Sequence, residues 1–157
     1  MTISITRPTL LIDKRKCLAN INRMAEMARR NRVIFRPHFK THQSAEIGEW
    51  FRQAGVEAIT VSSVSMAGYF AENGWNDITL AFPVNILEMD AINRLASQIR
   101  LNLLLESSET AAFLSLNLIA AAGIFIKIDT GYHRAGLDPE DTPAISAILS
   151  VINNNNN

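Results

Sequence analysis

The chain has 157 residues, an apolar content of 48%, and equal numbers of basic and acidic residues, fifteen of each. This length fits one modest domain with a hydrophobic core, and the balanced charge gives no indication of a nucleic-acid partner. The single cysteine, Cys17, excludes an internal disulfide framework and fits a reducing compartment.

The N-terminus and the apolar runs argue against secretion and membrane insertion. Arg7 and Asp13 come too early for the apolar region of a signal peptide. The longest apolar stretch, residues 118–126, is too short to cross a bilayer. We therefore expect a soluble, cytoplasmic protein without a membrane partner.

Apolar periodicity divides the chain into alternating strands and helices. A short strand is expected at residues 9–13, followed by a helix at residues 14–30. A buried strand is expected at residues 33–37, followed by a helix at residues 43–53, and this unit then repeats. The further expected strands are residues 58–61, 77–81, 100–105 and 124–128, and the further expected helices are residues 65–72, 85–98, 108–121 and 143–152. This alternation predicts parallel strands joined by right-handed crossovers, and hence the α/β class.

Two α/β architectures fit the alternation, a doubly wound sheet and a (β/α)8 barrel. No Gly-x-Gly-x-x-Gly turn follows the first strand, which disfavours the dinucleotide-binding sheet. Polar residues follow several strands at their carboxyl ends, the face on which a barrel places its active site. These residues are His38, Lys40, Ser62, Ser63, Glu106 and Asp129. We therefore expect a TIM-type (β/α)8 barrel.

The chain is too short for a complete barrel, which needs eight strands and roughly 250 residues. Its last residues, 153–157, form a low-complexity asparagine tail that cannot pack in a core. We therefore expect residues 1–152 to be the N-terminal portion of an incomplete barrel whose remainder is absent from the chain. An open barrel of this kind leaves two strand edges unpaired.

The first polar stretch with candidate chemistry reads Arg36-Pro37-His38-Phe39-Lys40-Thr41-His42 and follows an apolar run. Arg36, His38 and Lys40 share one parity along an extended chain, so they would point to the same face of the sheet. Cationic groups on an inner face are costly without a ligand or a counter-charge. We therefore expect these groups to face an anionic ligand.

The second polar stretch reads Lys127-Ile128-Asp129-Thr130-Gly131-Tyr132-His133-Arg134-Ala135-Gly136. Lys127 lies on the inner face if its strand continues, and there it needs an acceptor. The neighbouring strand offers Asn102 and Glu106 with matching parity. The two glycines of the stretch allow a tight turn that returns Arg134 over the strand end. We expect Arg134 to reach the same face of the barrel as the first stretch.

These two stretches resemble the motifs of a known enzyme family. Residues 36–42 resemble the cofactor-lysine motif of the D-threonine aldolase and eukaryotic-type D-serine dehydratase family. Residues 127–136 resemble the Lys-x-Asp-Thr-Gly-x-x-Arg-x-Gly motif shared more widely with alanine racemases. These are fold type III pyridoxal-phosphate enzymes, with an alanine racemase N-terminal domain that is a (β/α)8 barrel and a C-terminal β domain. The resemblance covers residues 7–150 and implies that the β domain is absent from this chain.

The resemblance also implies the roles of individual residues. Lys40 would form the Schiff base with pyridoxal 5′-phosphate and act as the base at the substrate's α-carbon. Arg134 would hydrogen-bond the phenolic oxygen of the cofactor, Lys127 would support Arg134, and His38 and His42 would line the site. The divalent-metal ligands of the family, a His-x-Cys pair in the C-terminal domain, have no counterpart here, so we assign no metal ligand.

The implied function is a pyridoxal-phosphate-dependent lyase or aldolase acting on a D-β-hydroxy amino acid such as D-threonine or D-serine. Two alternatives stay open at this point. One is a non-catalytic pyridoxal-phosphate-binding homeostasis protein, and the other is an amino-acid racemase. The expected partners are a small-molecule D-amino acid and, for the full-length protein, a second copy in a homodimer.

Overall fold

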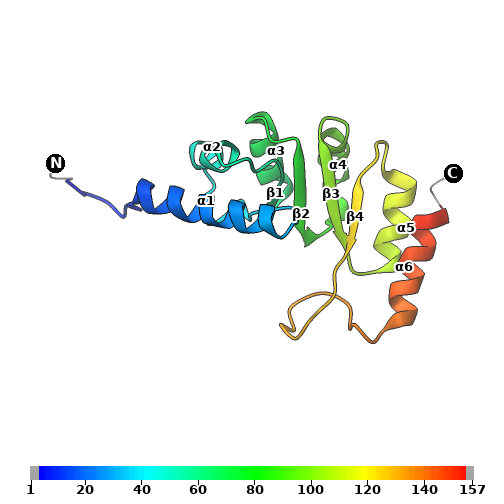
Figure 1. Ribbon diagram of the computed structural model, residues 1–157. Coiled ribbons are helices and arrows are strands. Elements are labelled where there is room, and N and C mark those ends of the chain that lie inside the picture. The colour runs from blue at the N-terminus through cyan, green and yellow to red at the C-terminus, as the bar shows by residue number, and fades with distance from the viewer. Residues whose placement is uncertain (1–3, 155–157) are drawn as a thin grey trace.

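Four parallel strands form the sheet of the computed structural model, which describes residues 4–154 (Figure 1). They are β1 (Ile59–Val61), β2 (Asp77–Pro83), β3 (Arg100–Leu105) and β4 (Gly123–Ile126), in the spatial order β1-β2-β3-β4. Each strand pairs in parallel with the next one along the chain. Because right-handed crossovers between sequential neighbours place the helices on one face, this order is that of a barrel wall.

Helices join the strands, and most begin at a capping side chain. Asp13 accepts a hydrogen bond from Lys16 N–H at the start of α1 (Lys14–Arg30). A serine has the same role at the start of α2 (Ala45–Gln53), α3 (Val64–Glu72) and α5 (Ser108–Asn117). The remaining helices are η1 (Phe39–Thr41), η2 (Ile86–Glu88), α4 (Met89–Ala96) and α6 (Thr142–Asn154). α3 and α4 pack on β2 and β3, and α5 packs beside α6 at the β4 end of the sheet (Figure 1).

The hydrophobic core lies between the sheet and these helices. Ile59, Ile78 and Leu101 form one row across the first three strands, and each is 0% exposed. Phe70 of α3 and Ile92 of α4 are buried in the same cluster. Side chains alternate between the two faces of a strand, so the neighbouring residues must face the other side of the sheet.

The opposite face of the sheet, the inner face of the barrel, is polar. Thr60, Thr79, Asn102 and Gly123 form one row across all four strands. Thr79 and Asn102 are nevertheless buried, at 6% and 5% exposure. Buried polar groups need hydrogen-bond partners, and on this face Asn102 finds them in the charged network described below.

The strand expected at residues 9–13 does not form, and the strand expected at residues 33–37 was also a wrong prediction. Residues 9–13 are irregular, and Leu10 is 77% exposed. Residues 33–37 have no strand assignment, and Ile34 is 77% exposed. The backbone of this segment pairs with the sheet at an isolated bridge, between His38 and Thr60. An apolar run becomes a buried strand only when neighbours cover it, and pairing of this kind is not a local property of the sequence.

Other boundaries differ from the sequence-based expectations by a few residues. The helix expected at residues 85–98 is split into η2 and α4, and the helix expected at residues 108–121 ends at Asn117, where Leu118 turns extended. β4 ends at Ile126 rather than residue 128. α6 runs to Asn154, into the expected asparagine tail, and residues 155–157 lie outside the described part. No helix in residues 4–154 is long and apolar enough to cross a membrane.

Candidate functional site

A cleft of about 350 Å³ lies beyond the carboxyl end of β4. It brings together Lys40, Lys127 and Arg134, three of the cationic residues that the sequence singled out in two distant stretches. The loop that follows β4, drawn in orange in Figure 1, forms most of its wall. The remaining lining residues are Ile128, Asp129, Thr130, Tyr132 and Ala135. A barrel places its active site at this end of the strands.

Lys40 owes its position to the residues on either side of it. Phe39 is fully buried, and its ring lies between 4.9 and 5.1 Å from the ring centroids of Phe51, Phe70 and Trp75. His38 caps the short helix η1, because its Nδ1 accepts the Lys40 N–H at 3.2 Å. The buried aromatic ring and the cap fix the backbone, while the Lys40 side chain itself remains exposed.

The loop after β4 is closed at its base by backbone hydrogen bonds. Leu137 N–H donates to Lys127 O at 2.9 Å, and Asp129 N–H donates to Leu137 O at 2.8 Å. Inside the loop, Asp129 Oδ1 accepts the N–H groups of residues 131, 132 and 133 at 3.0, 2.9 and 3.1 Å. The hydrogen bond from His133 N–H contributes most to lowering the pKa of Asp129. An ionised Asp129 therefore holds the turn in place.

Gly136 is required at the end of this loop. Its φ is +114°, and a β-carbon there would stand 2.8 Å from Asp129 N and 2.9 Å from Ile128 C. Its N–H donates to Glu106 Oε2 at 2.9 Å. Glu106 therefore binds the loop backbone, and the structure does not pair it with Lys127 as the sequence had led us to expect.

The three cations of the cleft have few partners in the chain. The Arg134 guanidinium lies over the Tyr132 ring, 5.1 Å from its centroid, in a cation–π contact. Within residues 4–154, Lys40, Lys127 and Arg134 form no ion pair with a carboxylate. Converging cations repel one another unless an anion lies between them. This arrangement therefore favours an anionic ligand.

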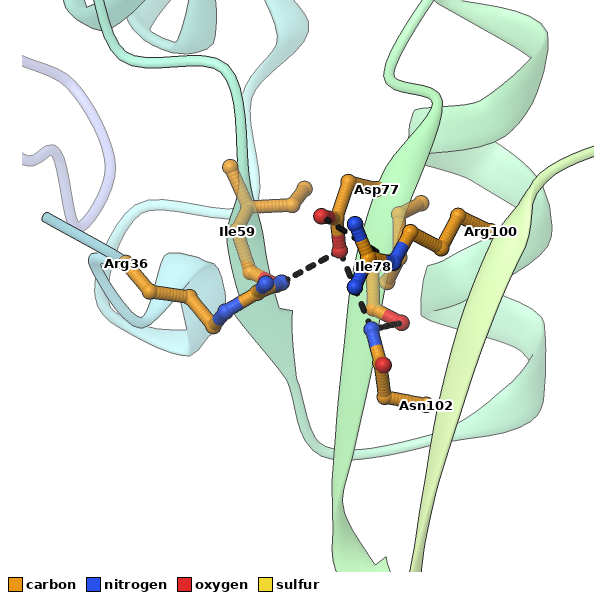
Figure 2. Close-up of polar contacts among 6 residues, drawn as sticks. All are labelled: Arg36, Ile59, Asp77, Ile78, Arg100 and Asn102. Carbon is orange, nitrogen blue, oxygen red and sulfur yellow. Dashed lines mark hydrogen bonds and ion pairs between the residues drawn. The ribbon is translucent and has the colours of Figure 1, made fainter. Parts of the chain in front are cut away.

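Arg36 does not belong to this cationic group, contrary to the expectation that it faces the same ligand. Figure 2 shows its guanidinium reaching Asp77, the first residue of β2, where Nη1 lies 2.6 Å from Oδ1. Asn102 Nδ2 donates to the same oxygen at 3.0 Å, so Asn102 contacts Asp77 rather than Lys127, for which the sequence had offered it as an acceptor. The counter-charge of Arg36 is thus inside the barrel. In the sequence, Asp77 stands out only as an acidic residue at the start of an apolar strand. That Arg36 is its partner depends on the sheet register and cannot be read from the sequence.

The two histidines are close to Lys40 in sequence but do not line the cleft. His42 packs against Phe39 and Phe51, at ring-centroid distances of 4.5 and 5.8 Å, and its Nδ1 accepts Ser44 N–H. Burial lowers the pKa of His42. Burial lowers the pKa of His38 as well, and the charge of Lys40 adds to the effect. Both histidines act in the structure as neutral acceptors that shape the backbone around Lys40.

Comparison with known proteins places these observations in a family. A family model described as "Alanine racemase, N-terminal domain" matches residues 12–155. The D-threo-3-hydroxyaspartate dehydratase of Delftia sp. strain HT23 is 33% identical over 161 residues, which cover 93% of this chain and 40% of that protein. Its solved structure matches with a TM-score of 0.86 at 30% identity, over 92% of this chain and 39% of that one. The match confirms the incomplete (β/α)8 barrel expected from the sequence.

Two further relatives are named as enzymes that act on other D-amino acids. The D-serine dehydratase of Dictyostelium discoideum is 28% identical over 163 residues, covering 96% of this chain and 41% of that protein. The D-threonine aldolase of Arthrobacter sp is 24% identical over 140 residues, covering 87% of this chain and 37% of that protein. The chain spans about two fifths of the length of these relatives. It belongs to the alanine racemase N-terminal domain family, and within that family it is similar to D-serine dehydratases and D-threonine aldolases.

Proposed function

We propose that the protein to which this chain belongs is a pyridoxal-phosphate-dependent lyase acting on a D-β-hydroxy amino acid, of the D-threonine aldolase or D-serine dehydratase type. The observation that carries the proposal is the convergence of Lys40, Lys127 and Arg134 on one cleft. The names of the similar enzymes support the substrate class, since D-threo-3-hydroxyaspartate, D-serine and D-threonine all carry a β-hydroxyl.

The residues of the cleft fit pyridoxal 5′-phosphate. The cofactor carries an aldehyde, with which a lysine amine condenses, and negative charges, which cations hold. Lys40 supplies the exposed amine, and Lys127 and Arg134 supply the cations. The cleft volume of about 350 Å³ lies at the lower end of the range for small-molecule sites, roughly 300–1,000 Å³. Among residues 4–154 there is no group of three His, Cys, Asp or Glu side chains that could hold a metal ion.

When bound, the cofactor supplies an electron sink for the bonds at the substrate's α-carbon. The residues of the chain do the rest. The Lys40 amine holds the cofactor and, when free, serves as the base for the proton on the α-carbon. Arg134, which lies over the Tyr132 ring, and Lys127 would hold the negative charge of the cofactor. His38 keeps the Lys40 backbone in place through its cap.

Covalent labelling of Lys40 tests the proposal. The chain would be expressed within its complete open reading frame, mixed with pyridoxal 5′-phosphate and reduced with borohydride, and the modified lysine would be located by peptide mass mapping. We expect the label on Lys40, with loss of the label and of its absorbance band in Lys40→Ala. Lys16→Ala is the matched control, because Lys16 is 77% exposed on α1, outside the cleft.

A label that persists unchanged in Lys40→Ala would contradict the proposal. Turnover of D-threonine to an aldehyde, or of D-serine or D-threo-3-hydroxyaspartate to a keto acid and ammonia, then separates aldolase from dehydratase. Labelling without turnover of any of these substrates would instead favour a non-catalytic cofactor carrier.

A further inference from the structure

The segment that carries Lys40 has few bonds to the sheet. Residues 33–37 lie outside the strands, and the backbone contact of this segment with β1 consists of the His38–Thr60 bridge and a hydrogen bond from Thr60 N–H to Pro37 O at 2.9 Å. Val33 and Ile34 are 61% and 77% exposed, so the apolar packing of this segment comes from Phe35, whose ring lies 6.3 Å from the Phe51 ring. A catalytic lysine has to be held within a fraction of an ångström of its working position. A polar contact between this segment and the strands would add to this packing and restrict the segment further.

Arg36 makes that contact, four positions before Lys40 along the chain (Figure 2). Its guanidinium donates to Asp77 Oδ1 at 2.6 Å and to Ile59 O at 3.4 Å, so it joins the segment to both β1 and β2. The side chains of Arg36 and Asp77 are 20% and 22% exposed. An ion pair sheltered to this degree is weakened less by water and salt than one on an open surface.

The carboxylate of Asp77 is in turn bound by a residue of β3. Asn102 Nδ2 donates to Asp77 Oδ1 at 3.0 Å and to Ile78 O at 3.4 Å. Burial by itself would raise the pKa of Asp77, but the hydrogen bond and charge of Arg36, with Asn102 and Arg100, lower the pKa overall. Asp77 is therefore ionised, and it accepts hydrogen bonds from both Arg36 and Asn102. The cluster lies at the first residues of β1, β2 and β3, away from the cleft.

We propose that the Arg36–Asp77 ion pair is a clamp that positions Lys40 for attachment to the cofactor, with Arg36 acting as a positioning residue from inside the barrel. The inference rests on the proposed function, because it assigns the clamp a purpose only if Lys40 holds pyridoxal phosphate. The clamp fixes one end of the lysine segment, and buried Phe39 fixes the other. The Lys40 side chain then leaves the backbone toward Lys127 and Arg134.

The clamp predicts a specific kinetic signature. Lys127 and Arg134 stay in place when Arg36 is lost, so the cleft still attracts the anionic cofactor. The amine, however, is no longer held in a reactive position. We therefore expect Arg36→Ala to lower the maximal rate of borohydride-trapped attachment at Lys40 by at least about tenfold, with a smaller change in the half-saturating pyridoxal-phosphate concentration.

The experiment compares variants of the residues around the Asp77 carboxylate. The protein is expressed from its complete open reading frame, and the rates are measured at a temperature at which circular dichroism shows that each variant is folded. Asp77→Asn should reproduce Arg36→Ala, and the double variant should be no slower than either single one, since both remove the same contact. Arg36→Lys, which keeps the charge but not the planar fork, should recover part of the rate. Arg100→Ala is the matched control. Arg100 Nε lies 3.9 Å from Asp77 Oδ2, but its side chain is 76% exposed, whereas that of Arg36 is 20% exposed.

The outcomes separate the clamp from the proposed function. Attachment in Arg36→Ala at the unsubstituted rate would overturn the clamp alone. An equal loss of rate in Arg100→Ala would also overturn it, because the effect would then follow the general charge of the cluster. Absence of any label on Lys40 in the unsubstituted protein would overturn the proposed function and the clamp together. If Arg36→Ala does not fold, the comparison of Asp77→Asn and Arg36→Lys with Arg100→Ala decides the question by the same criteria.

Discussion

The side-chain amide of Asn102 occupies the space beside Gly123 where a β-carbon would otherwise stand. A β-carbon built on Gly123 would collide with Asn102 Oδ1 and lie 3.2 Å from Asn102 Cγ. The two residues are register partners on β3 and β4. Because Oδ1 points to Gly123 and Nδ2 to Asp77, the absence of a side chain on β4 lets Asn102 hold the carboxylate that binds Arg36.

Gly123→Ala should therefore destabilise the fold. The new methyl group must displace the Asn102 amide, and we expect a loss of about 1–3 kcal/mol in the free energy of unfolding, the usual cost of overpacking. Denaturant unfolding measures it. Gly68→Ala is the control, because Gly68 lies in α3 with nothing within 4 Å of a new β-carbon. That change should stabilise by up to about 1 kcal/mol through helix propensity. Equal effects of the two substitutions would refute the proposed contact.

Gly136→Ala should impair the cleft more than Gly131→Ala. Both glycines have positive φ, at +114° and +106°, so alanine is strained at either position by about 1–2 kcal/mol. Only at Gly136 would the β-carbon also strike the backbone of Asp129 and Ile128. We expect Gly136→Ala to weaken pyridoxal-phosphate binding strongly and Gly131→Ala to weaken it little, as measured by fluorescence titration. The same affinity in both variants would show that crowding at Gly136 is unimportant.

The Asp77 carboxylate should make the fold sensitive to acid. Its pKa is lowered from the ordinary value of 3.8, so the folded state binds fewer protons than the unfolded chain. The stabilisation is therefore complete above that ordinary value and is lost as the pH falls through the lower folded pKa. Asp77→Asn should remove this part of the acid dependence and cost about 1–3 kcal/mol at neutral pH, as for other hydrogen bonds to charged groups. Urea midpoints measured between pH 2.5 and 7 test this, and an unchanged slope in the variant would count against it.

His42 should add a second pH dependence nearer neutrality. Burial lowers its pKa from the ordinary value of 6.5, so the unfolded chain takes up the proton first. Stability is then complete above 6.5 and declines as the pH falls toward the folded pKa. His42→Phe keeps an aromatic ring between Phe39 and Phe51 and should reduce the slope of stability between pH 5 and 7. Thermal unfolding across that interval measures it, and an unaltered slope would be the contrary result.

Much of the fold was accessible from local sequence patterns. The helix at residues 14–30 and the strand at residues 100–105 have the bounds that apolar periodicity predicts, and the regular alternation led to parallel strands and a barrel. These features depend on side chains a few positions apart, so a short stretch of sequence is enough to predict them. The prediction of a strand at residues 33–37 was wrong, because whether this segment pairs as a strand depends on neighbours from elsewhere in the fold.

The sequence by itself determined which side chains could carry the chemistry: Lys40 in one stretch, and Lys127 and Arg134 in another. Only the tertiary structure decided which groups lie next to these side chains. In the fold these three cations line one cleft. Arg36 instead forms an ion pair with Asp77, and Glu106 accepts a hydrogen bond from Gly136 N–H. The reason is that strand parity tells which face a residue occupies, whereas the register between strands tells which charge lies opposite, and register is set by pairing across the whole sheet.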